Sequence, residues 1–181
     1  FCITTMPAKN NILVKTLNGL NNWMLVWTGL GILVSVYALY IETKFEMNPE
    51  YVAACDINSI ISCTKVLDSR FAKGFGLVAP LLGEESVLNQ KNALYGLIVY
   101  FILSILSRSS SHSSIRLSQY IVYGITVGSI YLFAILLHLR AVCLVCYCTY
   151  FVNIGIFVNA RRRVFTLDQI VLSESNNRKS K

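Results

Sequence analysis

The chain has 181 residues, enough for one domain, and a formal net charge of +7 at pH 7. Hydrophobic residues make up 55% of it and charged residues 14%, whereas soluble domains average about 25% charged residues. So little charge cannot cover a water-facing surface, which excludes an ordinary soluble domain. The apolar residues also fall in runs that approach the roughly 20 residues needed to cross a bilayer.

Four apolar segments follow one another along the chain. Residues 23–41 and 93–107 carry no charge, and the second segment reaches span length if its helix begins at 87. Residues 117–139 contain one histidine, and residues 141–159 carry no formal charge. One such run could be a buried helix of a soluble protein, but the rest of the chain is too short to bury four. The sequence therefore predicts an all-α membrane protein, a four-transmembrane-helix bundle with helices at about 23–41, 87–107, 117–139 and 141–159.

The connections between these segments alternate in charge. The N-terminal segment (1–22) carries +2, the second connection +2 and the tail (160–181) +4. The first connection, from Glu42 to Asn92, has five basic and seven acidic residues, which gives −2. Basic residues mark the cytosolic side, so we expect both termini in the cytosol and the long loop (42–86) in a lumen or outside. The positive net charge is then a topology signal, and no nucleic-acid partner is expected.

The start of the chain carries little information. No cleavable signal peptide is expected, because the residues before Trp23 are mixed and polar and the first apolar run is already span-length. The chain begins at Phe1 rather than Met, so beyond the charge of this segment no inference rests on residues 1–20, and the role of Cys2 is left open.

The cysteines form two pairs in addition to Cys2 and Cys148. Cys55 and Cys63 lie in the long loop, and Cys143 and Cys146 form a C-x-x-C at the start of the fourth predicted helix. The predicted topology places both pairs on one oxidising side, where disulfide chemistry belongs. The helix dipole and the preceding arginine favour thiolate at such a helix start. The competing interpretations are inert buried thiols and a zinc site, and neither histidine has ligand spacing to the cysteines.

Helical periodicity places further polar groups beside the C-x-x-C. Residues at i, i+3 and i+7 share a face, and from Cys143 this face carries Cys146, Tyr150 and Asn153. Polar groups at membrane depth usually face the bundle interior or a cavity. We interpret Asn153 alone as a hydrogen bond between helices. The cysteines with Tyr150 predict a pocket for a planar redox ligand, whereas Cys148 points elsewhere and is expected to pack.

Four stretches of the chain resemble the vitamin K epoxide reductase family. They are ACDINSIISC in the first loop, SRFAKGFG (69–76), LNQKNALYG (88–96) and CLVCYCTY (143–150). Their order and spacing match over roughly residues 29–159. The resemblance implies a four-helix bundle around a quinone site in the endoplasmic reticulum membrane, capped by the lumenal loop. It also implies a dithiol that reduces vitamin K 2,3-epoxide to the quinone, and the quinone to the hydroquinone, with no permanently bound cofactor and no metal.

The resemblance further implies a role for individual residues. Cys146 is then the substrate-facing nucleophile, and Cys143 exchanges with the loop pair, which receives electrons from thioredoxin-like lumenal proteins. Coumarin-type inhibitors are compatible ligands. The implied site residues are Cys143, Cys146, Cys55 and Cys63 for catalysis and Asn92, Tyr150 and Ser69 for substrate binding.

Some residues depart from the family pattern, and two other functions stay open. The departures affect inhibitor response and the choice of paralogue rather than the redox core. A quinone-coupled thiol oxidase would use the same cysteines in the opposite direction, which redox poise and partners decide. A claudin-like structural protein also has four helices and a two-cysteine first loop, but does not need a C-x-x-C. The departing residues are Leu67, Phe71, Ala72, Lys73 and Cys148.

Overall fold

The computed structural model describes residues 8–48, 50–57, 61–67 and 69–179, so Cys2 and Asp68 lie outside the described residues. Throughout the described part the regular structure is helical, which confirms the predicted all-α class. The helices, in chain order, are α1 (Ala8–Met47), α2 (Cys63–Leu67), the 3-10 helix η1 (Gly74–Gly76), α3 (Val78–Leu82), α4 (Asn92–Ser107), α5 (His112–Leu139) and α6 (Leu144–Lys179).

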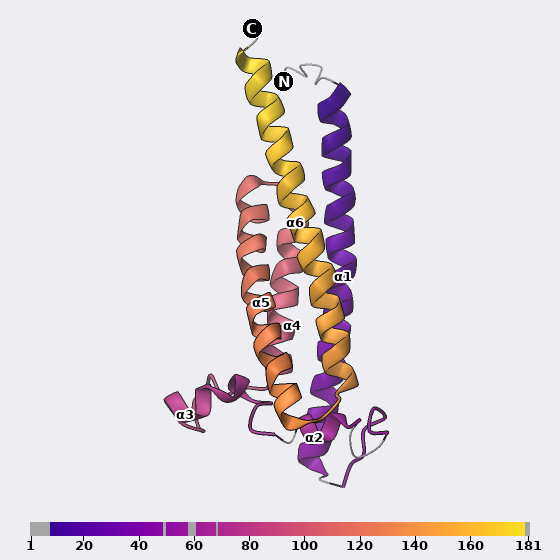
Figure 1. Cartoon of the computed structure of the whole chain (residues 1–181), viewed down its shortest axis with the longest axis vertical. Coiled ribbons are helices and arrows are strands. Elements are labelled where there is room, and N and C mark those ends of the chain that lie inside the picture. The colour runs from indigo at the N-terminus through magenta and orange to yellow at the C-terminus, as the bar shows by residue number, and fades with distance from the viewer. Residues whose placement is uncertain (1–7, 49, 58–60, 68, 180–181) are drawn as a thin grey trace.

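The four longest of these helices lie side by side along the long axis of the molecule (Figure 1). α1 packs against both α6 and α4, and α5 packs against the same two helices. The start of α1 and the end of α6 lie together, and we call this the terminal end of the bundle (Figure 1). The short helices α2 and α3 lie at the opposite end, which we call the loop end (Figure 1).

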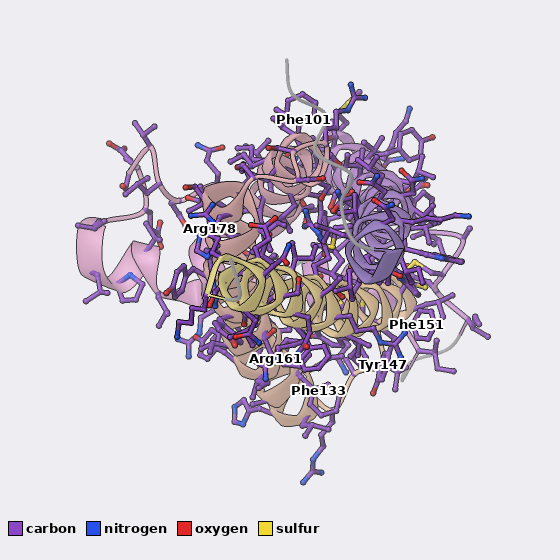
Figure 2. All side chains as sticks on the ribbon, turned by 90° about the horizontal axis from the view of Figure 1, so that it is seen from above. Phe101, Phe133, Tyr147, Phe151, Arg161 and Arg178 are labelled. Carbon is purple, nitrogen blue, oxygen red and sulfur yellow. A yellow bond between two sulfur atoms is a disulfide. The ribbon has the colours of Figure 1, made fainter. Side chains whose placement is uncertain are left out.

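The outside of the bundle is suited to lipid. α1, α5 and α6 are each long and apolar enough to cross a membrane. α4 is apolar but has 16 residues, or about 24 Å of helix, somewhat less than the roughly 30 Å of a hydrocarbon core. Large apolar side chains are exposed all around, and Phe101, Phe133, Tyr147 and Phe151 project outward in the end-on view of Figure 2. So apolar a surface is that of a multi-pass membrane protein.

The helix boundaries differ from the predicted spans at several points. α4 begins at Asn92 rather than at 87, because the preceding residues stay in the loop, where Lys91 forms an isolated bridge with Lys73. α6 continues without a break beyond 159, through most of the predicted tail. The sequence contains no glycine or proline after Gly155, so nothing in it ends the helix there.

A line of polar residues runs along the buried face of α1. Asn21, Thr28, Ser35 and Glu42 recur at intervals of seven residues, and each is more than nine-tenths buried. Seven residues are close to two helical turns, so the four side chains lie above one another on one face. We call them the polar stripe, which connects the terminal end to the loop end through the bundle interior.

Candidate active site

Cys143 and Cys146 lie at the loop end, at the start of α6. The sequence predicts Cys143 in the first turn of the helix and Cys146 one turn deeper, whereas Cys143 precedes the helix by one residue and Cys146 lies in its first turn. Their sulfur atoms are 2.7 Å apart, and the backbone N–H of Cys146 donates to the sulfur of Cys143 at 3.3 Å. Because an N–H at a helix start stabilises a thiolate, this pair is arranged for reversible disulfide formation. Cys143 is fully buried, whereas Cys146 is partly exposed.

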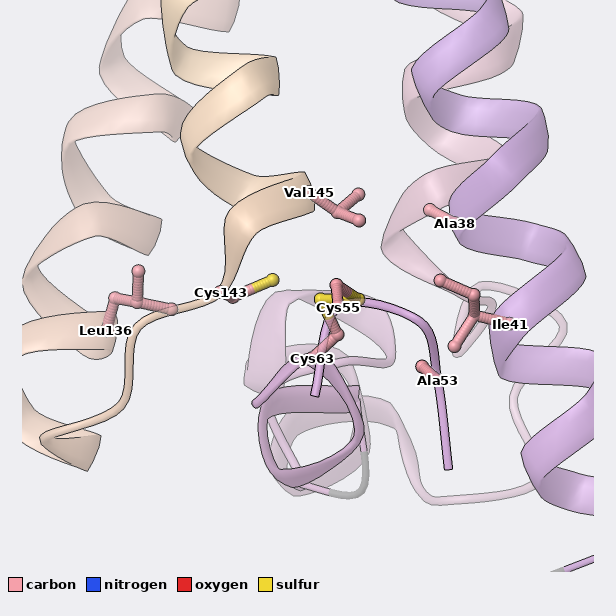
Figure 3. Packing of buried hydrophobic residues seen from close by; sticks show 8 residues of the cluster. All are labelled: Ala38, Ile41, Ala53, Cys55, Cys63, Leu136, Cys143 and Val145. Carbon is pink, nitrogen blue, oxygen red and sulfur yellow. A yellow bond between two sulfur atoms is a disulfide. The ribbon is translucent and has the colours of Figure 1, made fainter. Parts of the chain in front are cut away.

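The loop cysteines lie directly behind this pair. Cys55 and Cys63 form a disulfide with their Cα atoms 5.9 Å apart, and both side chains are buried. They belong to the same packed cluster as Cys143, whose side chain points toward the disulfide in Figure 3. The backbone N–H of Ser62 donates to the carbonyl of Val142 at 3.0 Å, which ties the loop to the segment just ahead of α6. The two sulfur pairs predicted to share one side are therefore neighbours.

Asp56 organises the loop around the disulfide. Its carboxylate accepts hydrogen bonds from the hydroxyl of Thr64 at 2.6 Å, the N–H of Thr64 at 3.1 Å and the N–H of Ala53 at 3.1 Å. Burial acts to raise the pKa of Asp56, but these bonds, with one from Ser62, outweigh it and hold the pKa below its ordinary value. The loop is thus built around an ionised carboxylate.

The same residues raise the question of a metal. Ligand atoms of Cys55, Asp56 and Cys63 lie within 4.8 Å of one another. Both cysteines, however, are joined in the disulfide, and metal binding to cysteine requires a thiolate. The grouping is therefore the product of the disulfide and of the loop that Asp56 holds.

A cavity of about 140 Å³ opens beside Cys146 between α1, α4, α5, α6 and the loop. Five of the seven predicted site residues line it, and the disulfide lies outside its wall, beyond Cys143. The rest of the wall is mostly aliphatic. An apolar cavity of about 150 Å³ holds one benzene ring, so this space suits one ring of a planar ligand. The predicted residues in the wall are Cys143, Cys146, Asn92, Tyr150 and Ser69.

Asn92 does more than face the cavity. Its side-chain nitrogen donates to the carbonyl of Phe71 at 2.6 Å, and its side-chain oxygen accepts from the N–H of Phe75 at 2.8 Å. The amide therefore fastens the loop to the start of α4. An amide nitrogen carries two hydrogens, so a second N–H remains beyond the one that Phe71 accepts.

The loop that Asn92 fastens has an unusual backbone. Gly74, Phe75 and Gly76 have φ angles of 53°, 58° and 70°, in the left-handed region. A Cβ on Gly74 would come within 2.6 Å of Val78, so only glycine fits there. Phe75 has no such freedom and is held in place by the bond from its N–H to Asn92 and by one from the hydroxyl of Tyr131 to its carbonyl.

The remaining predicted residues differ in how they are held. The hydroxyl of Ser69 donates to the carbonyl of Val66 at 2.6 Å, so it binds its own loop. The ring of Tyr150 packs edge-on against Phe133 and Tyr147, at centroid distances of 5.7 and 6.1 Å. These contacts fix the plane of the Tyr150 ring at the side of the cavity.

Asn153 and Cys148 are two further residues of α6 for which the sequence makes a prediction. Asn153 bridges helices, as predicted, because it accepts from the hydroxyl of Tyr100 at 2.6 Å and donates to Ser129 at 2.8 Å. Cys148 points away from the pair, as predicted, but it is exposed rather than packed. Its side chain lies on the lipid-facing surface instead of in a helix contact.

Sequence reasoning missed the polar residues that α1 contributes to the cavity wall. Ser35 and Glu42, both from α1, line it together with the cysteines. The signal that could have found them is the seven-residue interval of the polar stripe. A regular polar line along an apolar helix marks the face turned to the bundle interior.

The chain is similar in sequence to known proteins. Residues 22–160 match the vitamin K epoxide reductase family. The chain is 36% identical over 137 residues to vitamin K epoxide reductase complex subunit 1 of Rattus norvegicus, which covers 74% of this chain and 84% of the rat protein. It is 36% identical over 136 residues to the Mus musculus protein of the same name, with the same coverage. The chain belongs to the vitamin K epoxide reductase family.

Proposed function

We propose that this chain reduces vitamin K 2,3-epoxide to the quinone, and the quinone to the hydroquinone, with the dithiol of Cys143 and Cys146. Family membership makes it a membrane oxidoreductase of the vitamin K epoxide reductase type. The single observation that carries the proposal is the geometry of the two sulfur pairs. A dithiol lies in the wall of a ring-sized apolar cavity, and a disulfide is packed behind it.

The positions of the two thiols support a different role for each. Cys146, the more accessible, attacks the substrate and forms a sulfur–carbon bond. Cys143, whose sulfur is 2.7 Å away, then attacks the sulfur of Cys146 and breaks that bond. The electron pair of the broken bond stays with the product, and the two cysteines are left as a disulfide. One turnover therefore consumes one dithiol.

Exchange with the loop pair restores the dithiol. Once Cys55 and Cys63 have been reduced, one of their thiolates can attack the Cys143–Cys146 disulfide, because the two pairs share one packed cluster. The described structure has the loop pair oxidised and the active-site pair reduced. This is the state that follows transfer of electrons from the loop to the active site. We expect thioredoxin-like proteins of the lumen to reduce the loop pair.

Asn92 and Tyr150 complete the substrate site. The second N–H of the Asn92 amide and the hydroxyl of Tyr150 can each donate to a substrate oxygen. In a cavity of low dielectric constant, such donors stabilise charge as it develops on that oxygen. Ser69, whose hydroxyl is bound to its own loop, shapes the wall.

The proposed setting is the endoplasmic reticulum membrane. α1, α4, α5 and α6 are the four spans, both termini are cytosolic, and the loop at 42–86 is lumenal. A glycosylation acceptor placed in an exposed part of that loop should be modified, and one placed after Arg163 should not. The reverse pattern would move both cysteine pairs to the reducing side and contradict the proposal.

Turnover of vitamin K epoxide in membranes with a small dithiol reductant tests the function itself. We expect the quinone and then the hydroquinone as products, and no product from the Cys146→Ser variant in the same membranes. Oxidation of added thiols by quinone, with no reduction of the epoxide, would instead favour a thiol oxidase. No thiol chemistry in either direction would leave a structural role.

A further inference from the structure

Glu42 is the one acidic member of the polar stripe and differs from the others in its surroundings. Near the terminal end, Asn21 donates to Ser110 and accepts from Arg163, each at 2.9 Å. In the middle, Thr28 accepts from Ser104 at 2.8 Å. Glu42 is only 6% exposed, yet its Oε2 atom is buried and has no hydrogen-bond partner among the described residues.

The nearby basic residues do not supply that partner. Lys91 and Lys73 both bind Glu46, one turn further along α1, at 2.7 and 3.0 Å, so both oxygens of Glu46 are occupied. Lys91 also donates to Thr43 at 3.3 Å. The structural ion pairs of this region are thus made by Glu46. A buried carboxyl group without such a pair is least costly in its neutral, protonated form.

Glu42 lies between two cavities. It lines the apolar cavity that holds Cys143, Cys146 and Tyr150, and it also lines a second cavity of about 680 Å³. The second cavity is bordered by charged side chains and so suits water, which the apolar one does not. A carboxyl group in both walls can therefore exchange protons with water on one side and with reacting groups on the other. The charged residues around the second cavity are Glu46, Arg70, Lys73, Glu84 and Lys91.

We propose that Glu42 is the proton donor and acceptor of the reaction, a catalytic residue that faces the substrate from α1 across the cavity from the cysteines. This inference rests on the proposed function. Reduction of a quinone by a dithiol moves two electrons and two protons, and the sulfur atoms account only for the electrons. The protons need a carrier that reaches the substrate oxygen.

The steps balance as follows for the epoxide. Cys146 attacks as thiolate, the ring carbon–oxygen bond breaks, and Glu42 gives its proton to that oxygen. Cys143, as thiolate, then attacks Cys146, and the sulfur–carbon bond breaks. The electron pair of the sulfur–carbon bond forms the quinone double bond. The oxygen leaves at the same time, takes a second proton and becomes water. The two protons taken up equal the two that the thiols lost. Glu42 is reloaded by one of these or from the second cavity.

Glu42→Gln tests the proposal, because it removes the proton and keeps the shape. We expect its turnover number for vitamin K epoxide to fall by about 10²-fold, the lower end of general acid catalysis. Glu42→Asp, which keeps the acid on a shorter side chain, should recover part of the loss. Glu50→Gln is the control, because Glu50 is an exposed acidic residue just after α1 that lines neither cavity, and it should change turnover little.

The pH profile separates a proton carrier from a packing residue. The wild-type rate should rise with pH as the thiols ionise, and then fall as Glu42 loses its proton. Glu42→Gln should keep the rise and lose the fall. The groups that share the cavity walls with Glu42 and also titrate or carry charge are Tyr100, Cys143, Cys146 and Tyr150 in the first cavity and Glu46, Arg70, Lys73, Glu84 and Lys91 in the second.

Several outcomes would overturn the proposal. If the turnover of the wild type rises with pH and never falls, the proposal is wrong, whether or not the variants fold. It is also wrong if a folded Glu42→Gln variant has the turnover number and the pH profile of the wild type. If the wild type does not act on vitamin K epoxide but reduces a short-chain benzoquinone, the substrate assignment fails and the same comparison is made with that quinone. If it reduces neither, both proposals fall together.

Discussion

Buried polar side chains bind one another at one end of the bundle and line a cavity at the other. At the terminal end, Arg163 is fully buried, and its Nε and Nη1 atoms donate to Asn21 and Ser118 at 2.9 and 3.3 Å. Three helices are joined there by side chains that bind one another, although Nη2 has no partner among the described residues. At the loop end, the polar groups surround a cavity instead.

The difference teaches how one helix face can serve structure and chemistry at once. The polar stripe of α1 supplies Asn21 at one end and Glu42 at the other. Asn21 has protein partners on both atoms of its amide, so its role is complete within the fold. Glu42 has an oxygen with no partner among the described residues, in the wall of the cavity that the thiols also line, and we propose that its partner is the substrate. Stability and turnover should therefore respond separately at the two ends.

The largest effect is expected from the active-site thiols. Cys146→Ser should abolish turnover and show no substrate adduct, because the thiol proposed to attack the substrate is gone. Cys143→Ser should accumulate a covalent adduct on Cys146, with substrate or with a loop cysteine, because the resolving thiol is gone. Intact-mass measurement with vitamin K present distinguishes the two variants. A substrate adduct on Cys143 in the Cys146→Ser protein would reverse the two roles.

Asn92→Ala should affect both properties at the loop end. Loss of one donor to a developing oxyanion costs about 10²–10³ in rate in the best-studied case, and we expect less here because the ligand can move. The variant also loses its bonds to Phe71 and Phe75, which should cost about 1–3 kcal/mol. Kinetics and thermal unfolding in detergent measure the two losses. Unchanged kinetics in a folded variant would remove Asn92 from the substrate site.

The loop disulfide should be needed for turnover only when a protein supplies the electrons. A Cys55→Ala, Cys63→Ala variant should lose turnover with a thioredoxin-like protein reductant and keep most of it with a membrane-permeant dithiol. The reason is that a small dithiol can reach the Cys143–Cys146 disulfide directly. Equal loss with both reductants would show that the disulfide stabilises the loop rather than relaying electrons.

The smallest effect on turnover is expected at the terminal end. Arg163→Met should lower the free energy of unfolding by about 1–3 kcal/mol, because Asn21 and Ser118 lose their partner. The turnover number of the folded protein should stay unchanged, since no part of the cavity wall moves. Thermal unfolding and active-site titration of the same sample check this. A lower turnover number in fully folded protein would show that the two ends are coupled.

Much of the fold follows from local patterns in the chain. Long apolar runs predict the helices, and a C-x-x-C after Arg140 predicts reactive thiols at a helix start, because both signals lie within a few residues. The charge pattern placed the two cysteine pairs on one side, and the structure places them in one cluster. Local patterns also point to the pairing of the two loop cysteines and to the hydrogen bonds of Asn153 between helices.

Local patterns in the sequence do not predict the structure of the loop or the part of the site that α1 contributes. The loop is held by single long-range bonds, such as that from Asn92 to Phe71, and such bonds leave no periodic trace. The sequence predicts Glu42 in the loop, because the first apolar run ends at residue 41, whereas α1 continues to Met47. Because the helix continues past residue 41, the side chain of Glu42 lies in the cavity wall.

The uninterrupted length of α6 has a consequence outside the site. Its 36 residues make a rod about 54 Å long, whereas a hydrocarbon core is roughly 30 Å thick. With Leu144 at one surface, the helix reaches the other near Arg163, where Arg161 and Arg162 can meet lipid head groups. The remaining turns, about 24 Å of helix, then lie outside the hydrocarbon core. A probe attached near Lys179 is held away from the lipid at a distance that the helix sets.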